Sequence, residues 1–279
     1  MLGLKILEAA AAIVGIPAAV AYVSKHLNYG AFKWIKPKKI SEDQPNPVLI
    51  EKEGLSAHVA VDSEKYQSLE EFRETNKEKP LMLFFGGSCD IAYNAVGKYG
   101  VLWENVVFCS PDYYGTQSSR GTMNLNSMKQ TALDFYDKLI HPNSWRKVIV
   151  VGYSYGCGMA TYLASQRRVD SLILVSAYRD SADLYNIYTP IFFGVMKNLI
   201  GDNIKCVEYA KGVTCPAYII GSDRDLQLSA RIQKKIVKHF KDGHIKIFEG
   251  LKHTEYFQSP DVISYIQCII DECAKKEFQ

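Results

Sequence analysis

A serine stands where a β-branched run ends, within the sequence Gly-Tyr-Ser-Tyr-Gly at residues 152–156. Residues 148–151 (Val-Ile-Val-Val) are typical of a buried parallel strand, and residues 157–164 predict a helix. In such a tight turn Ser154 would point out of the carboxyl edge of the sheet, where the free NH groups at the helix start stabilise negative charge. These features favour acyl transfer; the alternative is a glycine-rich turn that only closes the strand-helix unit.

A serine hydroxyl is a weak nucleophile and needs a base, itself oriented by a carboxylate. Where a serine occupies a turn of this kind, the acid and the base follow it in the order Asp, then His, each just after a later strand. His253 follows the strand-like residues 244–248 and lies three residues past Gly250, so we predict that it is the base. Solvent exposure or local capping would explain the other five histidines, which are His26, His58, His141, His239 and His244.

Two aspartates on one loop compete for the role of the acid. Asp223 and Asp225 both follow the strand-like residues 216–220. The residues after Asp225 place an aliphatic side chain and then a helix start at distances that resemble a D-x-x-V-P turn, which favours Asp225 over Asp223. Asp180, after the preceding strand, is a remote third candidate.

An acyl transition state also needs NH donors for its oxyanion. Tyr155, the residue after the serine, would supply one backbone NH. The sequence Leu-Phe-Phe-Gly-Gly-Ser-Cys-Asp at residues 83–90 would supply the other, with Gly87 the predicted donor because glycine lets its backbone approach a bound ester closely. The alternative for Gly86 and Gly87 is a plain turn.

The elements that must position these residues alternate along the chain. Periodicity predicts helices within residues 125–139 and 232–240, and Ser259 with Pro260 predicts the start of a last helix. Two further strands within residues 48–61 would pair antiparallel at an edge, because the residues between them are too few for a helical crossover. The pattern predicts an α/β fold: a mostly parallel, eight-stranded sheet with helices on both faces. Its other strands are predicted at residues 80–85, 105–109, 147–151, 171–175, 216–220 and 244–248.

Composition narrows the function. The 279 residues, 47% hydrophobic and 23% charged, suit one large globular domain, and a net charge of +3 is too small to argue for nucleic acid. There is no zinc-like Cys-x-x-Cys pair and no phosphate-binding glycine loop. The spacing of the seven cysteines does not match a disulfide framework, so we predict that they are reduced residues of the core. They are Cys89, Cys109, Cys157, Cys206, Cys215, Cys268 and Cys273.

Residues 1–35 form an apolar N-terminal segment with three open interpretations. As a weak membrane anchor through residues 2–23, it would hold the domain on the cytoplasmic side, because basic residues follow it. As a signal peptide it would be cleaved near Ala21, giving a secreted protein, and as a packing or partner helix it would need no membrane. Residues 36–47 are charged and proline-bearing, which predicts a linker into the domain at 48–279.

Several motifs together resemble the α/β-hydrolase superfamily. Phe-Gly-Gly-Ser-Cys-Asp resembles its oxyanion loop, residues 112–121 resemble its D-Y-x-G-x-G-x-S-x-G loop, and residues 152–156 resemble its nucleophile elbow. The loops bearing the acid and His253 complete the set. The similarity spans roughly residues 48–275 and is closest to the branch that includes α/β-hydrolase-domain lipases, depalmitoylases and serine aminopeptidase-like proteins. Phe85 replaces the usual histidine of the oxyanion loop, and Thr116 and Gln117 stand where that branch often has glycine.

The resemblance implies a serine hydrolase that cleaves an ester or thioester through Ser154, His253 and Asp225, with no metal or organic cofactor. Residues 181–211 would form a small cap, apolar enough to suit a hydrophobic or lipid-like acyl substrate, although a helix packed on the domain is the alternative. An acyltransferase or peptidase using the same three residues, and a non-catalytic binding protein, remain open. The predicted substrate-binding residues are Tyr153, Tyr185, Tyr188, Phe192, Phe193 and Met196.

Overall fold

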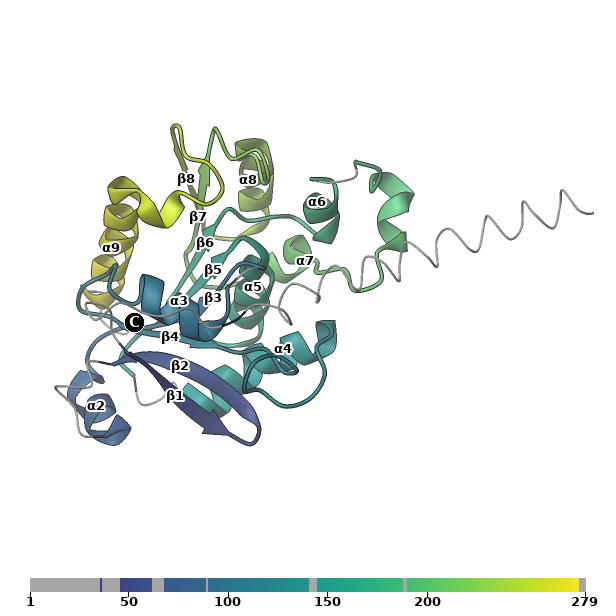
Figure 1. Cartoon of the computed structure of the whole chain (residues 1–279). Helices are drawn as coiled ribbons and strands as arrows, with labels where there is room; N and C mark the ends of the chain where they lie inside the picture. The colour runs from purple at the N-terminus through teal and green to yellow at the C-terminus, as the bar shows by residue number, and fades with distance from the viewer. Residues whose placement is uncertain are drawn as a thin grey trace, which may run out of the picture.

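The computed structural model describes residue 36 and residues 46–61, 68–88, 90–140, 145–187 and 190–275. The predictions for residues 1–35, for most of the linker at 36–47, and for Cys89, His141 and Tyr188 therefore concern residues outside this set. Within the described residues, eight strands form one sheet in the order β1-β2-β4-β3-β5-β6-β7-β8 (Figure 1), which confirms the predicted mostly parallel sheet. The strands are β1 (Asn46–Lys52), β2 (Leu55–Val61), β3 (Leu81–Phe85), β4 (Val107–Pro111), β5 (Val148–Tyr153), β6 (Ser171–Val175), β7 (Ala217–Ser222) and β8 (Gly243–Phe248).

The antiparallel pairings are confined to one edge of the sheet. β1 pairs antiparallel with β2, and β2 pairs antiparallel with β4, whereas every later pair is parallel. Glu53 and Gly54 connect β1 to β2 with φ values of 51° and 82°. Two consecutive positive φ values are the geometry of a tight hairpin turn, so this short connection gives the predicted edge pair.

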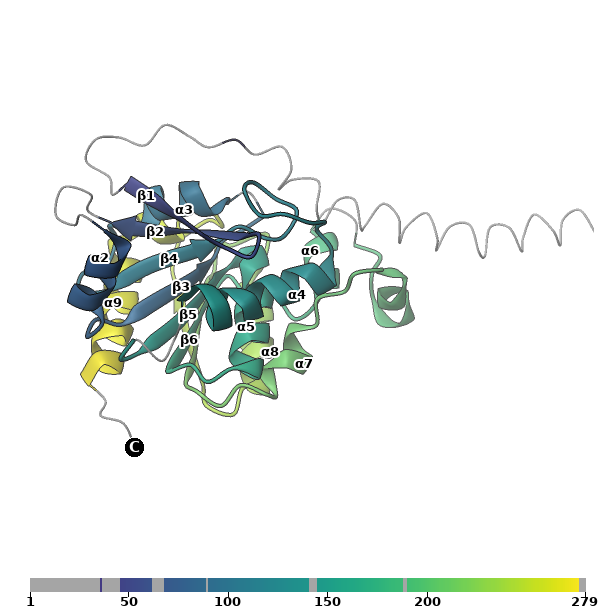
Figure 2. The same ribbon diagram turned by 90° about the horizontal axis from the view of Figure 1, so that it is seen from below.

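Side chains alternate between the two faces of the sheet and build a core on each side. Leu83 and Val150 face one core together with Met159 of α5, whereas Phe84 and Val151 face the other. Figure 2 shows α4, α5 and α8 on one side of the sheet and α9 on the other. The helices are α2 (Leu69–Asn76), α3 (Ala92–Tyr99), α4 (Leu125–Asp134), α5 (Cys157–Gln166), α6 (Ser181–Tyr185), α7 (Cys206–Ala210), α8 (Ala230–Ile236) and α9 (Pro260–Lys275).

Short helical turns extend or connect these elements. The predicted helix at 125–139 is in fact α4 followed by a π-helical segment, η1 (Phe135–Ile140), and the one at 232–240 is α8 followed by η5 (Val237–His239). Pro260 begins α9 as predicted. The other turns are η3 (Ser154–Gly156), η4 (Gly194–Leu199) and η6 (Tyr256–Gln258).

The described part of the chain holds six cysteines, and all are free thiols, five of them buried. The five buried thiols agree with the predicted reduced core cysteines, whereas Cys268 is reduced but exposed, so its predicted place in the core is wrong. In the same residues, no helix combines the length and the hydropathy that crossing a bilayer requires.

Candidate active site

Ser154 lies at the turn where β5 meets η3 and α5, at the carboxyl edge of the sheet. Its φ of 50° falls in the left-handed region, which costs a non-glycine residue about 1–3 kcal/mol and persists only where the surroundings impose it. Those surroundings leave room only for glycine on either side. A Cβ added to Gly152 would lie 2.6 Å from Cα of Cys157, and one added to Gly156 would lie 2.0 Å from the carbonyl oxygen of Phe85.

The structure brings Ser154, His253 and Asp225 into one hydrogen-bonded chain. His253 Nε2 lies 2.9 Å from Ser154 Oγ, and His253 Nδ1 lies 3.0 Å from Asp225 Oδ2. A carboxylate only accepts hydrogen bonds, so Nδ1 carries the proton and Nε2 is left to accept from the serine. The imidazole is 12% exposed and the carboxylate is 0% exposed, so the chain runs from a nearly covered ring into the protein interior.

Asp225 remains ionised despite its burial. Desolvation alone would raise its pKa, but hydrogen bonds from His253 and Ser176 outweigh that effect and hold the pKa below its ordinary value. On the other carboxylate oxygen, Oδ1, the backbone NH groups of Gln227 and Leu228 donate at 3.0 and 2.9 Å. A charged carboxylate in this position can orient the imidazole and stabilise its protonated form.

The two other aspartates considered for this role have different partners. Asp223 accepts the NH of Gly250 at 2.7 Å and thereby fastens the loop that carries His253. Asp180 caps α6 by accepting the NH of Ala182 at 3.0 Å, and it pairs with Lys197. Neither is recorded in contact with the imidazole.

Two further residues at the site were not found by sequence reasoning. Ser176 follows β6 directly, and its Oγ lies 2.5 Å from Asp225 Oδ2 and 3.1 Å from His253 Nδ1. The hydroxyl of Tyr256 donates to the same oxygen of Asp225 at 3.0 Å. The only signals in the sequence were positional, since Ser176 directly follows a predicted strand and Tyr256 stands three residues after the predicted base.

The predicted oxyanion donors differ in their surroundings. The NH of Gly87 donates to Asp90 Oδ2 at 3.0 Å, and a Cβ on Gly87 would lie 3.4 Å from the ring of Tyr153. Tyr155 is buried, and its carbonyl accepts the hydroxyl of Tyr178 at 3.0 Å, which fixes the first turn after the serine. The oxyanion role of both NH groups stays a prediction.

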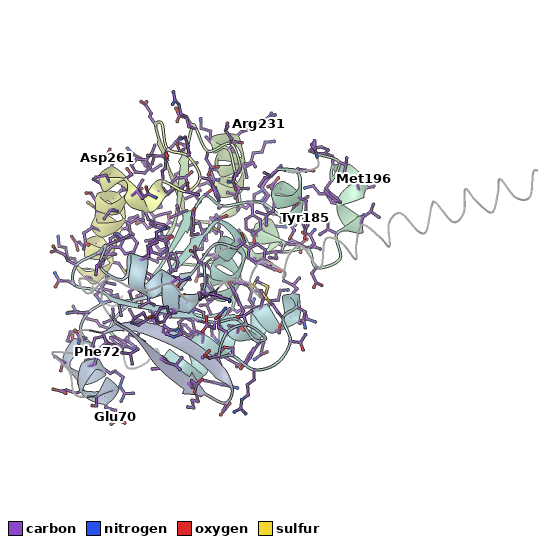
Figure 3. The ribbon with its side chains drawn as sticks, in the orientation of Figure 1. Glu70, Phe72, Tyr185, Met196, Arg231 and Asp261 are labelled. Carbon is purple, nitrogen blue, oxygen red and sulfur yellow. The ribbon has the colours of Figure 1, made fainter. Side chains whose placement is uncertain are left out.

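The predicted substrate-binding residues divide into buried and exposed members. Tyr153 stacks on the His253 ring with 5.6 Å between centroids, and Tyr185 packs against Phe192 at 5.6 Å. Phe193 and Met196, by contrast, are 59% and 39% exposed. Figure 3 shows Tyr185 and Met196 on the side of the molecule opposite α9, and in this view α5 and α8 lie between them and α9.

His58 departs from the sequence expectation of solvent exposure or local capping. It is 8% exposed, its Nδ1 lies 3.6 Å from Asp112 Oδ2, and this nitrogen has no hydrogen-bond partner among the described residues. Burial lowers the pKa of His58 to about 4 and raises the pKa of Asp112 to about 6. At that distance, and with a neutral imidazole, the two residues do not form an ion pair. Side chains alternate along β2, and His58 lies on the face of the sheet that α3 covers. Asp112 accepts a hydrogen bond from the first NH of α3, that of Ala92, at 3.2 Å.

Metal ligation has no candidate in the residues that the structure describes, since no three His, Cys, Asp or Glu side chains gather there in a way that could hold an ion.

Comparison with known proteins agrees with this architecture. Residues 107–204 match a family model described as the alpha/beta hydrolase fold. No curated protein matches the chain in sequence.

Solved structures of low sequence identity share the fold. Est1E from Butyrivibrio proteoclasticus, in a structure with bound ferulic acid, has 17% identity, a TM-score of 0.58 and coverage of 82% of this chain and 100% of its own. An esterase from Pyrococcus furiosus has 12% identity, a TM-score of 0.58 and coverage of 87% and 99%. A bacterial membrane phospholipase A has 14% identity, a TM-score of 0.60 and coverage of 99% and 98%. With the family match over residues 107–204 and the eight-stranded sheet, these likenesses show that the chain has the α/β-hydrolase fold.

Proposed function

We propose that the protein is a serine hydrolase that cleaves an ester or thioester through an acyl-enzyme intermediate. The observation that carries the proposal is the unbroken contact from Ser154 to His253 to Asp225, at 2.9 and 3.0 Å. These three side chains are far apart in the sequence, and hydroxyl, imidazole and carboxylate in this order are the groups that activate a serine.

The geometry supports a two-step reaction. His253 Nε2 takes the proton of Ser154 as Oγ attacks the acyl carbon, and the imidazole then gives that proton to the leaving group. Asp225 stabilises the imidazolium that forms between these events. The oxyanion would lie near the NH of Tyr155 at the start of the η3–α5 segment, where the helix dipole favours negative charge. Water, activated by the same imidazole, then hydrolyses the acyl-enzyme.

A hydrophobic acyl group is the substrate class that we propose. Phe193 and Val195 are 59% and 80% exposed in the segment before and within η4, an unusual exposure for large apolar side chains. The likeness to a membrane phospholipase A agrees with a lipid-like substrate. Association with a membrane through residues 2–23 belongs to the same proposal and would bring the enzyme to such substrates.

Active-site labelling tests the reaction class. A fluorophosphonate probe should label the wild-type protein and a control variant, Ser165→Ala. In the wild type the Ser165 hydroxyl donates to the carbonyl of Tyr162 in α5, away from the triad. The Ser154→Ala variant should lose both the label and the hydrolysis of p-nitrophenyl esters. Labelling that persists in Ser154→Ala, or a wild-type protein that neither labels nor hydrolyses any ester, would overturn the proposal.

A series of p-nitrophenyl esters of increasing chain length tests the substrate class. We expect kcat/KM to rise with chain length and the Phe193→Ser variant to lose this rise while keeping its activity on acetate. The Val101→Ser variant is the matched control, because Val101 is 52% exposed and precedes β4. A preference for aminoacyl arylamides over every ester would contradict the acyl-chain proposal and favour a peptidase.

A further inference from the structure

We propose that Ser176 and Tyr256 are positioning residues of this site, whose hydroxyl groups fix the Asp225 carboxylate and, through it, the imidazole. The inference rests on the proposed function. It goes beyond the triad because it identifies what holds the acid in a single orientation.

One oxygen of the Asp225 carboxylate accepts hydrogen bonds from three donors. Asp225 Oδ2 lies 2.5 Å from Ser176 Oγ, 3.0 Å from the Tyr256 hydroxyl and 3.0 Å from His253 Nδ1. Ser176 and Tyr256 are both 0% exposed, so water does not substitute for their hydroxyl groups. With two backbone NH groups on Oδ1 as well, the carboxylate cannot rotate without breaking several buried hydrogen bonds.

The backbone holds Ser176 in the conformation that this contact needs. Its φ is 55°, a left-handed value, and its NH donates to the carbonyl of Ile220 in β7 at 2.8 Å. The buried side chain of Gln233 clamps the next residue, Ala177, by accepting its NH at 3.0 Å and donating to its carbonyl at 2.7 Å. A strained residue that its surroundings hold so firmly at an active edge is typical of a functional constraint.

The position of Ser176 also links the acid to the base. Its Oγ lies 3.1 Å from His253 Nδ1, so one hydroxyl can donate to Asp225 Oδ2 and accept a share of the Nδ1 proton. This triangle restricts rotation of the imidazole about its contact with the acid. Proton transfer from Ser154 depends on that restriction, because a rotated ring would move Nε2 away from Oγ.

Tyr256 acts on the charge of the acid. Burial, followed by the nearby charge of Asp225, raises the pKa of Tyr256 far above its ordinary value, so its hydroxyl stays protonated and donates. Among the described residues, the titratable groups facing the carboxylate are His253 and Tyr256, and Tyr153 stacks on the imidazole. Donors on Oδ2 draw off negative charge and so moderate its attraction for a protonated imidazole. Losing one donor should therefore favour the protonated ring and move the acidic limb of the rate profile to higher pH.

The test is the pH profile of ester hydrolysis for Tyr256→Phe and Ser176→Ala. We expect kcat to fall about ten-fold with little change in KM, and the acidic limb of kcat/KM to rise by about half a pH unit, because each variant loses one buried hydrogen bond to the Asp225 carboxylate. The matched control is Tyr114→Phe, because the Tyr114 hydroxyl also donates to a carboxylate, that of Asp134, at 2.8 Å. Its profile should coincide with that of the wild type.

A second substitution guards against a folding defect at position 176. Ser176→Gly removes the hydroxyl and also relieves the positive φ, so it should fold and still show the shifted limb. Profiles of Tyr256→Phe and Ser176→Gly that coincide with the wild type would overturn the inference while leaving the proposed function intact. A wild-type enzyme that shows neither labelling nor hydrolysis would instead overturn the proposed function itself.

Discussion

The amide of Gly87 donates its hydrogen bond to the carboxylate of Asp90, with 3.0 Å between N and Oδ2. In return, the amide of Asp90 donates to the carbonyl of Gly87 at 3.0 Å, which closes a tight turn after β3. The donor predicted for the oxyanion thus faces a side chain that carries negative charge when ionised. An oxyanion that forms beside it would compete for the same NH group.

Asp90→Asn should therefore raise the rate of ester hydrolysis. The amide oxygen of asparagine can still accept from Gly87, but a hydrogen bond to a neutral acceptor is weaker than one to a charged acceptor by about 1 kcal/mol. The NH would be released more easily to the transition state, and we expect kcat to increase about five-fold. An unchanged or lower kcat, with normal thermal unfolding, would show that Gly87 is not an oxyanion donor.

The two neighbouring aspartates should respond very differently to the same substitution. Asp225→Asn removes the charge that stabilises the imidazolium and disturbs the tautomer of His253, so kcat should fall by about 10⁴. Asp223→Asn keeps an oxygen that can accept from the NH of Gly250, and its kcat should fall less than ten-fold. Steady-state hydrolysis of one ester by both variants distinguishes them, and equal losses would contradict the assignment of Asp225 as the acid.

Alanine should reduce the free energy of unfolding more at Gly156 than at Gly194. An added Cβ at Gly156 would lie 2.0 Å from backbone of β3, so the elbow would have to separate from that strand, at a cost of about 3 kcal/mol or more. Gly194 has a φ of 52° but no atom within 4 Å of an added Cβ, so alanine there should cost only about 1 kcal/mol. Urea unfolding measures both free energies, and similar values would contradict the packing argument.

The buried pair His58 and Asp112 should give opposite pH dependences of stability when either is removed. Burial raises the pKa of Asp112 from 3.8 to about 6. Its contribution to the free energy of unfolding is therefore fully present below pH 3.8 and is lost as the pH rises to 6. Burial lowers the pKa of His58 from 6.5 to about 4. Its contribution to the free energy of unfolding is therefore fully present above pH 6.5 and is lost as the pH falls to 4. Between pH 4 and 6 the two effects cancel in the wild type.

Urea unfolding at several pH values between 4 and 6 checks this cancellation. Relative to the wild type, His58→Gln should gain stability as the pH falls, and Asp112→Asn should lose it, each by about 1 kcal/mol per pH unit. Parallel curves for the two variants and the wild type would contradict the opposing titrations.

Local patterns were sufficient to predict much of the fold. The β-branched run at 148–151 and the short connection at Glu53–Gly54 each determine a local conformation, and the structure shows β5 and the hairpin there. Element ends were less predictable. The strand expected at 105–109 is β4 at Val107–Pro111, because pairing with β3 rather than hydrophobicity decides where its ladder begins.

The site was predictable only where chain order constrained it. Ser154 and His253 stand just after strands whose ends meet at one edge, so their proximity follows from the topology. Ser176 and Tyr256 reach Asp225 through tertiary contacts, and neither a hydroxyl after a strand nor a tyrosine after a histidine signals such a contact. The burial of His58 was missed for a related reason. The sequence places its strand at the edge of the sheet, whereas β2 pairs with both β1 and β4, and nothing near His58 in the sequence indicates that Asp112, just after β4, lies beside it.

Tyr153, which precedes Ser154, also holds the backbone of His253. The Tyr153 hydroxyl donates to the carbonyl of His253 at 2.7 Å, while its ring stacks on the imidazole. Because of these two contacts, we expect a displacement of the end of β5 to move Ser154 and His253 in the same direction and to leave the distance between Oγ and Nε2 largely unchanged. Turnover should then follow the electrophilicity of the acyl group more closely than the mobility of the surrounding loops.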